Sequence, residues 1–203
     1  ETQNVSLGVS LLRRSEMDRI TFNGGYFYGR QRDRDSGDHI TSQNEWFAGL
    51  QYDYFFTPKL YVYANTRVER DEIANLDLRL LAGLGGGYQL FETADFRFAV
   101  EGGGGWSYEV YDNAGSSDHA FIRCAYHIAK KFGTRLALFH DLEIFPSVED
   151  FSDFFLTTQG GLRASLTKAM FAEMKIVVDH DSTPAPGSKN TDVKYIFGAG
   201  ITF

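Results

Sequence analysis

The chain lacks the features on which several protein classes depend. Cys124 is its only cysteine among 203 residues, which excludes a disulfide framework and a cysteine-rich metal site. No stretch approaches the roughly 18 apolar residues of a transmembrane helix, because runs such as 60–64 and 136–139 are soon interrupted by polar residues. The net charge of −7 argues against nucleic-acid binding through a basic surface.

The chain is instead rich in glycine and aromatic residues, with 21 Gly, 18 Phe, 11 Tyr and 2 Trp in a sequence that is 43% hydrophobic. Only 4 Pro are present, and the composition does not divide the chain into two regions. We therefore expect one domain spanning residues 1–203. If this domain crosses a membrane, it must do so with strands.

The end of the chain shows the alternation of a β-strand with one apolar face. Every second residue is apolar: Val193, Tyr195, Phe197, Ala199, Ile201 and Phe203. A strand that closes on phenylalanine resembles the carboxy-terminal insertion signal of bacterial outer-membrane barrels, to which we assign Phe197, Gly198, Ile201 and Phe203. Ile196 departs from that signal, which usually has a polar residue there. The alternative is an edge strand of a soluble sheet.

The same period of two recurs along the whole chain. It marks segments at residues 3–14, 18–32, 42–56, 59–70, 76–90, 95–111, 119–132, 134–145, 154–167, 170–180 and 192–203. These segments predict an all-β fold, an antiparallel up-and-down transmembrane β-barrel with about eleven strands in this chain.

The connections between these segments alternate in length. Short ones around residues 15–18, 57–58, 92–93, 131–134 and 167–169 alternate with longer, acidic ones at 33–39, 71–75, 112–118, 146–153 and 181–190. Bacterial barrels have short periplasmic turns and longer external loops, which places the carboxy terminus in the periplasm. They also have even strand numbers, so we expect a twelfth strand ahead of Glu1. A miscount of the segments is the competing explanation.

The two faces of each segment differ in polarity. In segment 76–90, alternate residues from Leu76 to Leu90 are apolar or glycine, whereas the other set includes Asp77, Arg79 and Gln89. Segments 60–70 and 120–131 divide in the same way, and Cys124 falls on an apolar face. The apolar face of a membrane barrel contacts lipid and the polar face lines the interior. A soluble barrel has the opposite arrangement.

Aromatic residues on the apolar faces help to separate these two possibilities. They lie near the long loops (Tyr28, Trp46, Trp106, Tyr108 and Tyr195) and near the short turns (Tyr52, Tyr54, Tyr88, Tyr126, Phe132 and Phe203). Two aromatic belts around an aliphatic band are typical of membrane barrels, because tyrosine and tryptophan favour the lipid–water interfaces. A soluble β-sandwich or lipocalin-like barrel remains the alternative.

Several motifs resemble a known family. They lie at residues 61–64, 69–71, 76–90, 141–151, 161–163, 166–168 and 184–187. They are similar to motifs of the domain-of-unknown-function 481 family, the YdiY-like proteins described as salt-induced outer-membrane proteins. The resemblance implies a bacterial outer-membrane barrel in contact with lipid and lipopolysaccharide, inserted by the barrel-assembly machinery. It brings no catalytic residues and no cofactor.

The inward faces carry the candidate functional residues. By alternation these are Arg67, Glu69, Asp77, Arg79, Glu101, Glu109, Arg123, His127, Arg135, Asp141, Glu143, Arg163, Glu173, Lys175, Asp179 and Lys194. Charges of both signs suit a narrow or gated pore for ions or small hydrophilic solutes. The same charges would form a closed plug if they paired across the interior. A barrel of this size permits both.

Glycines are concentrated in one sector of the predicted wall. Gly83, Gly85 and Gly87 lie on one inward face, and the run 102–105 follows in the next segment. Because no helix pattern follows, a phosphate-binding loop is excluded. The glycines indicate either curvature of the barrel or a groove in which a loop, a subunit or another strand packs.

Histidines and acidic loops suggest further chemistry, but each lacks a necessary partner. His140 faces outward, as the histidine of an outer-membrane phospholipase does, yet no serine is placed beside it, so we expect no enzyme activity. His180 and the acidic residues near 33–38, 149–153 and 179–181 offer ligands for Ca²⁺ or a bridge to lipopolysaccharide. They lack the spacing of a calcium loop, so we expect a solvated anionic surface and no metal site.

Overall fold

The computed structural model describes residues 2–32, 38–112, 115–184 and 189–201. The regular elements of these residues are β-strands. Within the same residues, no helix is long and apolar enough to cross a membrane, which does not bear on spans made of strands. The strands are β1 (Thr2–Arg14), β2 (Asp18–Arg32), β3 (His39–Phe55), β4 (Leu60–Asp71), β5 (Leu76–Glu92), β6 (Phe96–Tyr111), β7 (Gly115–Phe132), β8 (Leu136–Pro146), β9 (Phe154–Ser165), β10 (Met170–Asp181) and β11 (Thr191–Ile201).

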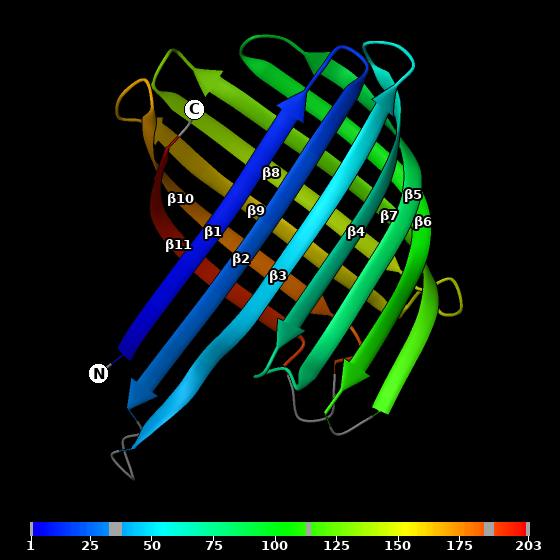
Figure 1. The fold of residues 1–203 in the computed structure, drawn as a ribbon, viewed down its shortest axis with the longest axis vertical. Helices are drawn as coiled ribbons and strands as arrows, with labels where there is room; N and C mark the ends of the chain where they lie inside the picture. The colour runs from blue at the N-terminus through cyan, green and yellow to red at the C-terminus, as the bar shows by residue number, and fades with distance from the viewer. Residues whose placement is uncertain (1, 33–37, 113–114, 185–188, 202–203) are drawn as a thin grey trace.

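Each strand pairs with the strands that precede and follow it in the chain, so the sheet order is β1 to β11 without a crossover. All ten pairings are antiparallel. The sheet curls into a nearly closed barrel (Figure 1), in which β1 and β11 are the edge strands and do not pair with each other over the described residues. The predicted all-β, antiparallel up-and-down barrel and its eleven strands are confirmed.

Two strands begin three or four residues earlier than the alternation predicts. β3 begins at His39 rather than at residue 42, and β7 begins at Gly115 rather than at residue 119. The residues 116–118 were predicted as a loop because they are small and polar, yet they continue the backbone ladder opposite Tyr108, Glu109 and Val110. Polar composition therefore marks the ends of the apolar segment, while the hydrogen-bonded hairpin continues beyond it.

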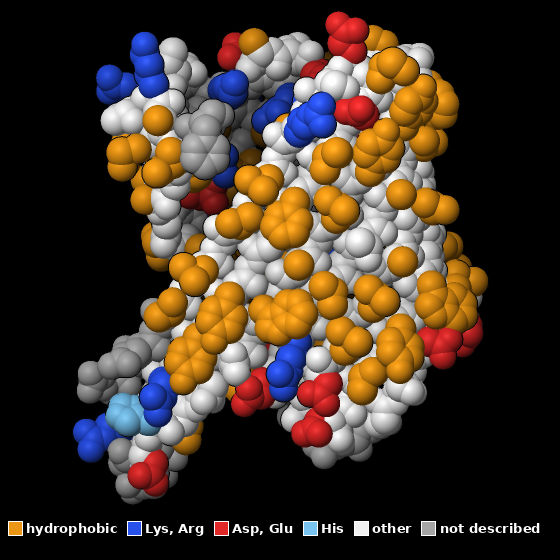
Figure 2. All heavy atoms as spheres, viewed as in Figure 1, with side chains coloured by type: hydrophobic (Ala, Val, Ile, Leu, Met, Phe, Trp, Pro, Cys, Tyr) orange, Lys and Arg blue, Asp and Glu red, His pale blue; other side chains and the backbone are white. Residues whose placement is uncertain are grey.

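The outer surface is apolar and the interior is polar. Large apolar side chains that point outward are widely exposed, from Leu84 on β5 to Phe197 on β11, which are 68% and 74% exposed. Figure 2 shows this apolar surface over the strands that face the viewer, with charged side chains concentrated toward both ends. By contrast, the buried residues include Asp53, Glu101 and Arg123. This distribution is the reverse of that in a soluble barrel.

The glycine-rich sector is filled from within by aromatic rings of neighbouring strands. A Cβ atom on Gly87 would overlap the Tyr61 ring, and one on Gly85 would overlap the Tyr63 hydroxyl. Both tyrosines are buried, at 0% and 3% exposure, and Phe121 lies over Gly105 in the same way. The glycines therefore make room for rings of this chain, and neither the predicted groove nor curvature alone describes their role.

This packing predicts that Gly87→Ala destabilises the barrel. The added methyl group must displace the fully buried Tyr61 ring, so the free energy of unfolding should fall by about 1–3 kcal/mol. Gly86→Ala is the matched control, since its Cβ would meet only the Tyr61 carbonyl oxygen at 3.7 Å. Urea titration of the refolded proteins measures both. Equal losses in the two variants would contradict the packing.

Candidate functional site

Charged side chains from nearly every strand meet in the barrel interior, where they form two clusters. The Arg79 cluster lies toward the long-loop end and comprises Glu69, Arg79, Glu109, Tyr111 and Asp181. The Glu101 cluster lies toward the short-turn end and comprises Arg19, Asp53, Tyr61, Glu101, Arg123, His127, Asp141 and Glu143. Charges withdrawn from bulk water are normally paired in this way.

Arg79 is the centre of the first cluster. Its guanidinium donates to Glu109 Oε1 at 2.7 Å, to Glu69 Oε1 at 3.0 Å and to Asp181 Oδ2 at 3.1 Å. The Tyr111 hydroxyl donates in turn to Glu109 Oε2 at 2.6 Å. Glu69 and Glu109 lie on the strands beside β5, whereas Asp181 lies at the end of β10. Arg79 therefore connects opposite walls of the barrel.

Glu101 is the centre of the second cluster. Its carboxylate accepts from Arg123 Nη1 at 2.7 Å and from the Tyr61 hydroxyl at 2.6 Å. Arg123 also contacts Glu143 at 2.9 Å, and Arg19 pairs with the fully buried Asp53. Arg19 comes from β2 and lies 3.9 Å from Glu101 on β6. This cluster therefore also spans several strands of the wall.

A third connection joins the edge strand β11 to the opposite wall. Lys194 Nζ donates to Glu45 Oε2 on β3 at 2.8 Å and to Asp179 Oδ2 on β10 at 3.1 Å. Because β11 has no partner on its outer side among the described strands, its interior connection to β3 is carried by this side chain. The lysine thus holds the edge strand against the far wall.

The interior is not filled uniformly. The most deeply buried charged side chains are those of Asp53 on β3, Glu101 on β6 and Arg123 on β7, with exposures of 0%, 1% and 3%. On β7 and β8, His127, Glu143 and Asp141 keep 37%, 29% and 26% of their side-chain surface accessible. These three residues are ion-paired like the rest of the Glu101 cluster but more accessible, and we call them the accessible strip.

Two predicted interior residues have different surroundings. Asp77 is on the outer surface, where it contacts Arg70 at 3.6 Å, while Leu76 is buried in its place. The cause is a β-bulge between Leu76 and Leu78, which shifts the alternation by one residue. Arg135 is exposed in the turn before β8, because that strand begins at Leu136. The inward prediction for Asp77 was wrong, and that for Arg135 stays a prediction.

The other predicted interior charges point inward and have polar partners. Arg67 donates to Glu69 at 2.6 Å, Arg163 to Glu173 at 2.7 Å, and Lys175 to the Gln159 side chain at 3.4 Å. Arg163 and Glu173 lie near the short-turn end, where Arg163 keeps 47% of its side chain accessible. Arg67 thus extends the Arg79 cluster, and the Arg163–Glu173 pair extends the polar lining at the short-turn end.

Several residues of the two clusters and of the Lys194 connection were not predicted. Arg19, Asp53 and Glu45 alternate with outward-facing residues such as Tyr52 and Tyr54, so they belong to the inward set. The register of the β2–β3 hairpin could have identified the first two, because Arg19 lies directly opposite Asp53 across that ladder. Asp181 was interpreted as part of a solvated rim, yet it contacts Arg79.

The predicted interface aromatics occupy the outer surface. Trp46, Trp106, Tyr108, Tyr195, Tyr52, Tyr54 and Tyr88 are exposed, whereas Tyr28 and Tyr126 are half-buried. Of the predicted insertion signal, Phe197 and Ile201 point outward and are exposed, Gly198 lies between them, and Phe203 falls outside the described residues. Cys124 is exposed on the same apolar surface.

His140 is held by two neighbours on the outer surface. The Tyr126 hydroxyl lies 3.0 Å from its Nδ1 atom, and the Thr158 hydroxyl lies 3.4 Å from its Nε2 atom. Thr158 also donates to the Asp141 carbonyl oxygen at 2.9 Å. His180, at the long-loop end, contacts Thr191 at 2.8 Å. Across the described residues, no group of three or more His, Cys, Asp or Glu is arranged to hold a metal ion.

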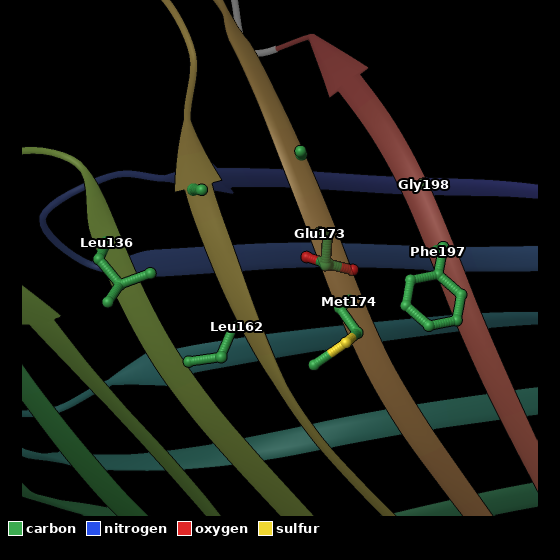
Figure 3. A pocket seen from close by; sticks show the side chains of 8 residues that line it. Leu136, Leu162, Glu173, Met174, Phe197 and Gly198 are labelled. Atoms are coloured by element: carbon green, nitrogen blue, oxygen red, sulfur yellow. The ribbon is translucent and has the colours of Figure 1, made fainter.

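The outer wall also carries a shallow apolar depression of about 390 Å³. Leu136, Leu162, Met174 and Phe197, from the four strands β8 to β11, surround it, and Ala164, Ala172 and Gly198 leave it hollow (Figure 3). Glu173 is the one charged residue of its lining, and that carboxylate is paired with Arg163. The depression is therefore a feature of the apolar surface.

The fold and the interior together define an up-and-down antiparallel β-barrel with an apolar outside and an ion-paired, charged inside. The chain belongs to the family described as protein of unknown function, DUF481, whose model matches residues 1–203. The predicted family is thus confirmed. Among eleven matching chains of known structure, a NanC porin is similar, with 10% identity, a TM-score of 0.59 and coverage of 98% of this chain and 99% of the porin. No curated protein matches the chain.

The Arg79 cluster predicts a large cost for removing its cation. Arg79→Ala would leave Glu109 buried without its cationic partner and Glu69 with Arg67 alone, so the free energy of unfolding should fall by about 3–5 kcal/mol. Arg70→Ala is the matched control, because Arg70 is 48% exposed and pairs with Asp77 on the outer surface. Its loss should cost no more than about 1 kcal/mol. Urea titration of the refolded variants measures the difference, and similar losses would contradict the assignment.

Proposed function

We propose that the protein spans the outer membrane of a bacterial envelope and forms a narrow pore for ions or small hydrophilic solutes. The exposed apolar wall supports the membrane location, because soluble proteins rarely expose contiguous apolar surface of more than a few hundred Å². Lipid and lipopolysaccharide would cover this wall, and the barrel-assembly machinery would insert it. The likeness to a NanC porin agrees with this proposal through the shared fold.

The observation that carries the pore is the strip of accessible charges beside the packed wall. His127, Asp141 and Glu143 point inward and yet keep between 26% and 37% of their side-chain surface accessible. A charged wall that stays accessible to water allows hydrated solutes to pass and sets which of them do so. Wide porins have more strands than this barrel, so its passage would be narrow.

A closed, non-conducting barrel is the second candidate, and a specific observation favours it. Arg79, Arg123 and Lys194 each contact carboxylates on more than one strand, as a plug of paired charges requires. In that case the barrel would support the envelope or bind partners through its acidic loops. The two candidates differ in whether the accessible strip continues through the interior.

Thiol modification in a conducting barrel tests the pore. With Cys124 replaced by serine, Lys175→Cys places a thiol on the inward face in the middle of β10, and Met174→Cys places one on the lipid-facing side. A bulky, water-soluble thiol reagent should lower the single-channel conductance of the first variant, because the passage is narrow. It should leave the second unchanged, since lipid covers that position.

The measurement uses the complete protein refolded into a planar bilayer. Absence of conductance in the unmodified protein at every voltage and salt concentration would support the closed barrel instead. Equal block of the Lys175→Cys and Met174→Cys variants would also refute the passage through the interior, because only Lys175 faces it.

A further inference from the structure

A pocket opens at the long-loop end of the barrel, above the Arg79 cluster. Its volume is about 310 Å³. Its walls come from β5 to β7, from the β8–β9 connection and from β10, and they include Glu109, Asp118, Glu149, Asp150, Asp153 and Asp181. We call this feature the mouth pocket. It joins the surface of the protein to the charged interior, because Arg79, Glu109 and Asp181 belong both to its lining and to the Arg79 cluster.

The β8–β9 connection that forms one wall is fixed in place. Ser147 lies opposite Phe121 in an isolated bridge, and the Val148 N–H donates to the Ala120 carbonyl oxygen at 2.9 Å. The Ser147 N–H donates to the Asp153 carbonyl oxygen at 2.8 Å. The base of the pocket includes the rings of Phe145 and Phe155, and Phe155 lies 5.0 Å from the Arg79 guanidinium. Its shape is therefore built by ordered contacts.

The charge of this pocket is strongly one-sided. Arg79 is its only lysine or arginine, against six carboxylates, and Arg79 is already paired with Glu69, Glu109 and Asp181. In the part of the chain that the structure describes, Asp118, Glu149 and Asp150 take part in no salt bridge. Hydrogen bonds from the Ser152 hydroxyl and N–H lower the pKa of the Asp150 carboxyl, which stays charged at neutral pH.

The other half of the interior is balanced. Its cations lie among as many carboxylates: Arg14, Arg19, Arg123, Arg163 and Lys175 against Asp53, Glu101, Asp141, Glu143 and Glu173. The fixed charge along the barrel axis therefore changes from negative at the mouth to near neutral at the short-turn end. A concave surface of one charge, walled by low-dielectric protein, concentrates ions of the opposite charge.

We propose that the mouth pocket makes the pore selective for cations, with Asp118, Glu149 and Asp150 as the residues that determine this specificity. The inference rests on the proposed pore and adds the class of solute that it admits. Small cations would gather in the pocket and enter the accessible strip, whereas anions would meet the field of the unpaired carboxylates. Rings of acidic side chains select cations in other channels by the same electrostatics.

The reversal potential across a planar bilayer with a KCl gradient tests this inference on the complete protein. The unmodified pore should prefer K⁺ over Cl⁻. Neutralising two charges of the mouth pocket with Asp118→Asn and Glu149→Gln should reduce the permeability ratio of K⁺ to Cl⁻ roughly two- to fivefold. The reduction should be smaller at high salt, because exposed charges are screened. The matched control is Asp77→Asn, which removes a carboxylate from β5 on the outer surface beside Arg70.

The control should leave the ratio unchanged. A Cl⁻ preference in the unmodified protein, or a ratio that the double substitution does not alter, would overturn the selectivity while leaving the pore intact. A protein that conducts neither ion would overturn the pore, and the selectivity with it. Folding of each variant is checked by heat-modifiable migration in gels. A double variant that misfolds is replaced by Glu149→Gln alone. The change in the logarithm of the permeability ratio should then be about half of that expected for the double substitution.

Discussion

The ion pairs of Arg79 are the interaction on which the rest of the interior depends. An arginine that is only 6% exposed needs charged partners, and Arg79 has them on β4, β6 and β10. The contact with Asp181 reaches across the barrel to a strand 102 residues later in the chain. This pairing sets the distance between two walls and forms the floor of the mouth pocket.

The division between the two faces of the sheet explains how such an interior can exist. Outward residues are apolar and exposed, so the interior is free to hold charges, tyrosines and glycines rather than a hydrophobic core. Tyr61 illustrates the arrangement, since its ring packs over Gly87 while its hydroxyl donates to Glu101. Packing and ion pairing thus reinforce one rigid wall, and the accessible charges of β7 and β8 lie beside it. The proposed pore depends on this asymmetry.

The sequence predicts most of this fold because alternation with a period of two depends only on local backbone geometry. It fails where the geometry changes, as at the bulge that exchanges Leu76 and Asp77 between the two faces. The ion pair of Arg19 is predictable from the hairpin register, because Arg19 lies directly opposite Asp53 in the β2–β3 ladder. The contacts of Arg79 with Asp181 and of Lys194 with Glu45 are not predictable in this way, because they depend on the tilt and closure of the whole sheet.

A double-mutant cycle between Arg79 and Asp181 tests the cross-barrel pairing most directly. The free energies of unfolding are measured for Arg79→Met, Asp181→Asn and the double variant in the same detergent. A coupling energy of at least about 1 kcal/mol is predicted, as for residues that share one ion-pair network. A coupling energy within about 0.3–0.5 kcal/mol of zero, as for independent sites, would show that the two walls are not joined through this contact.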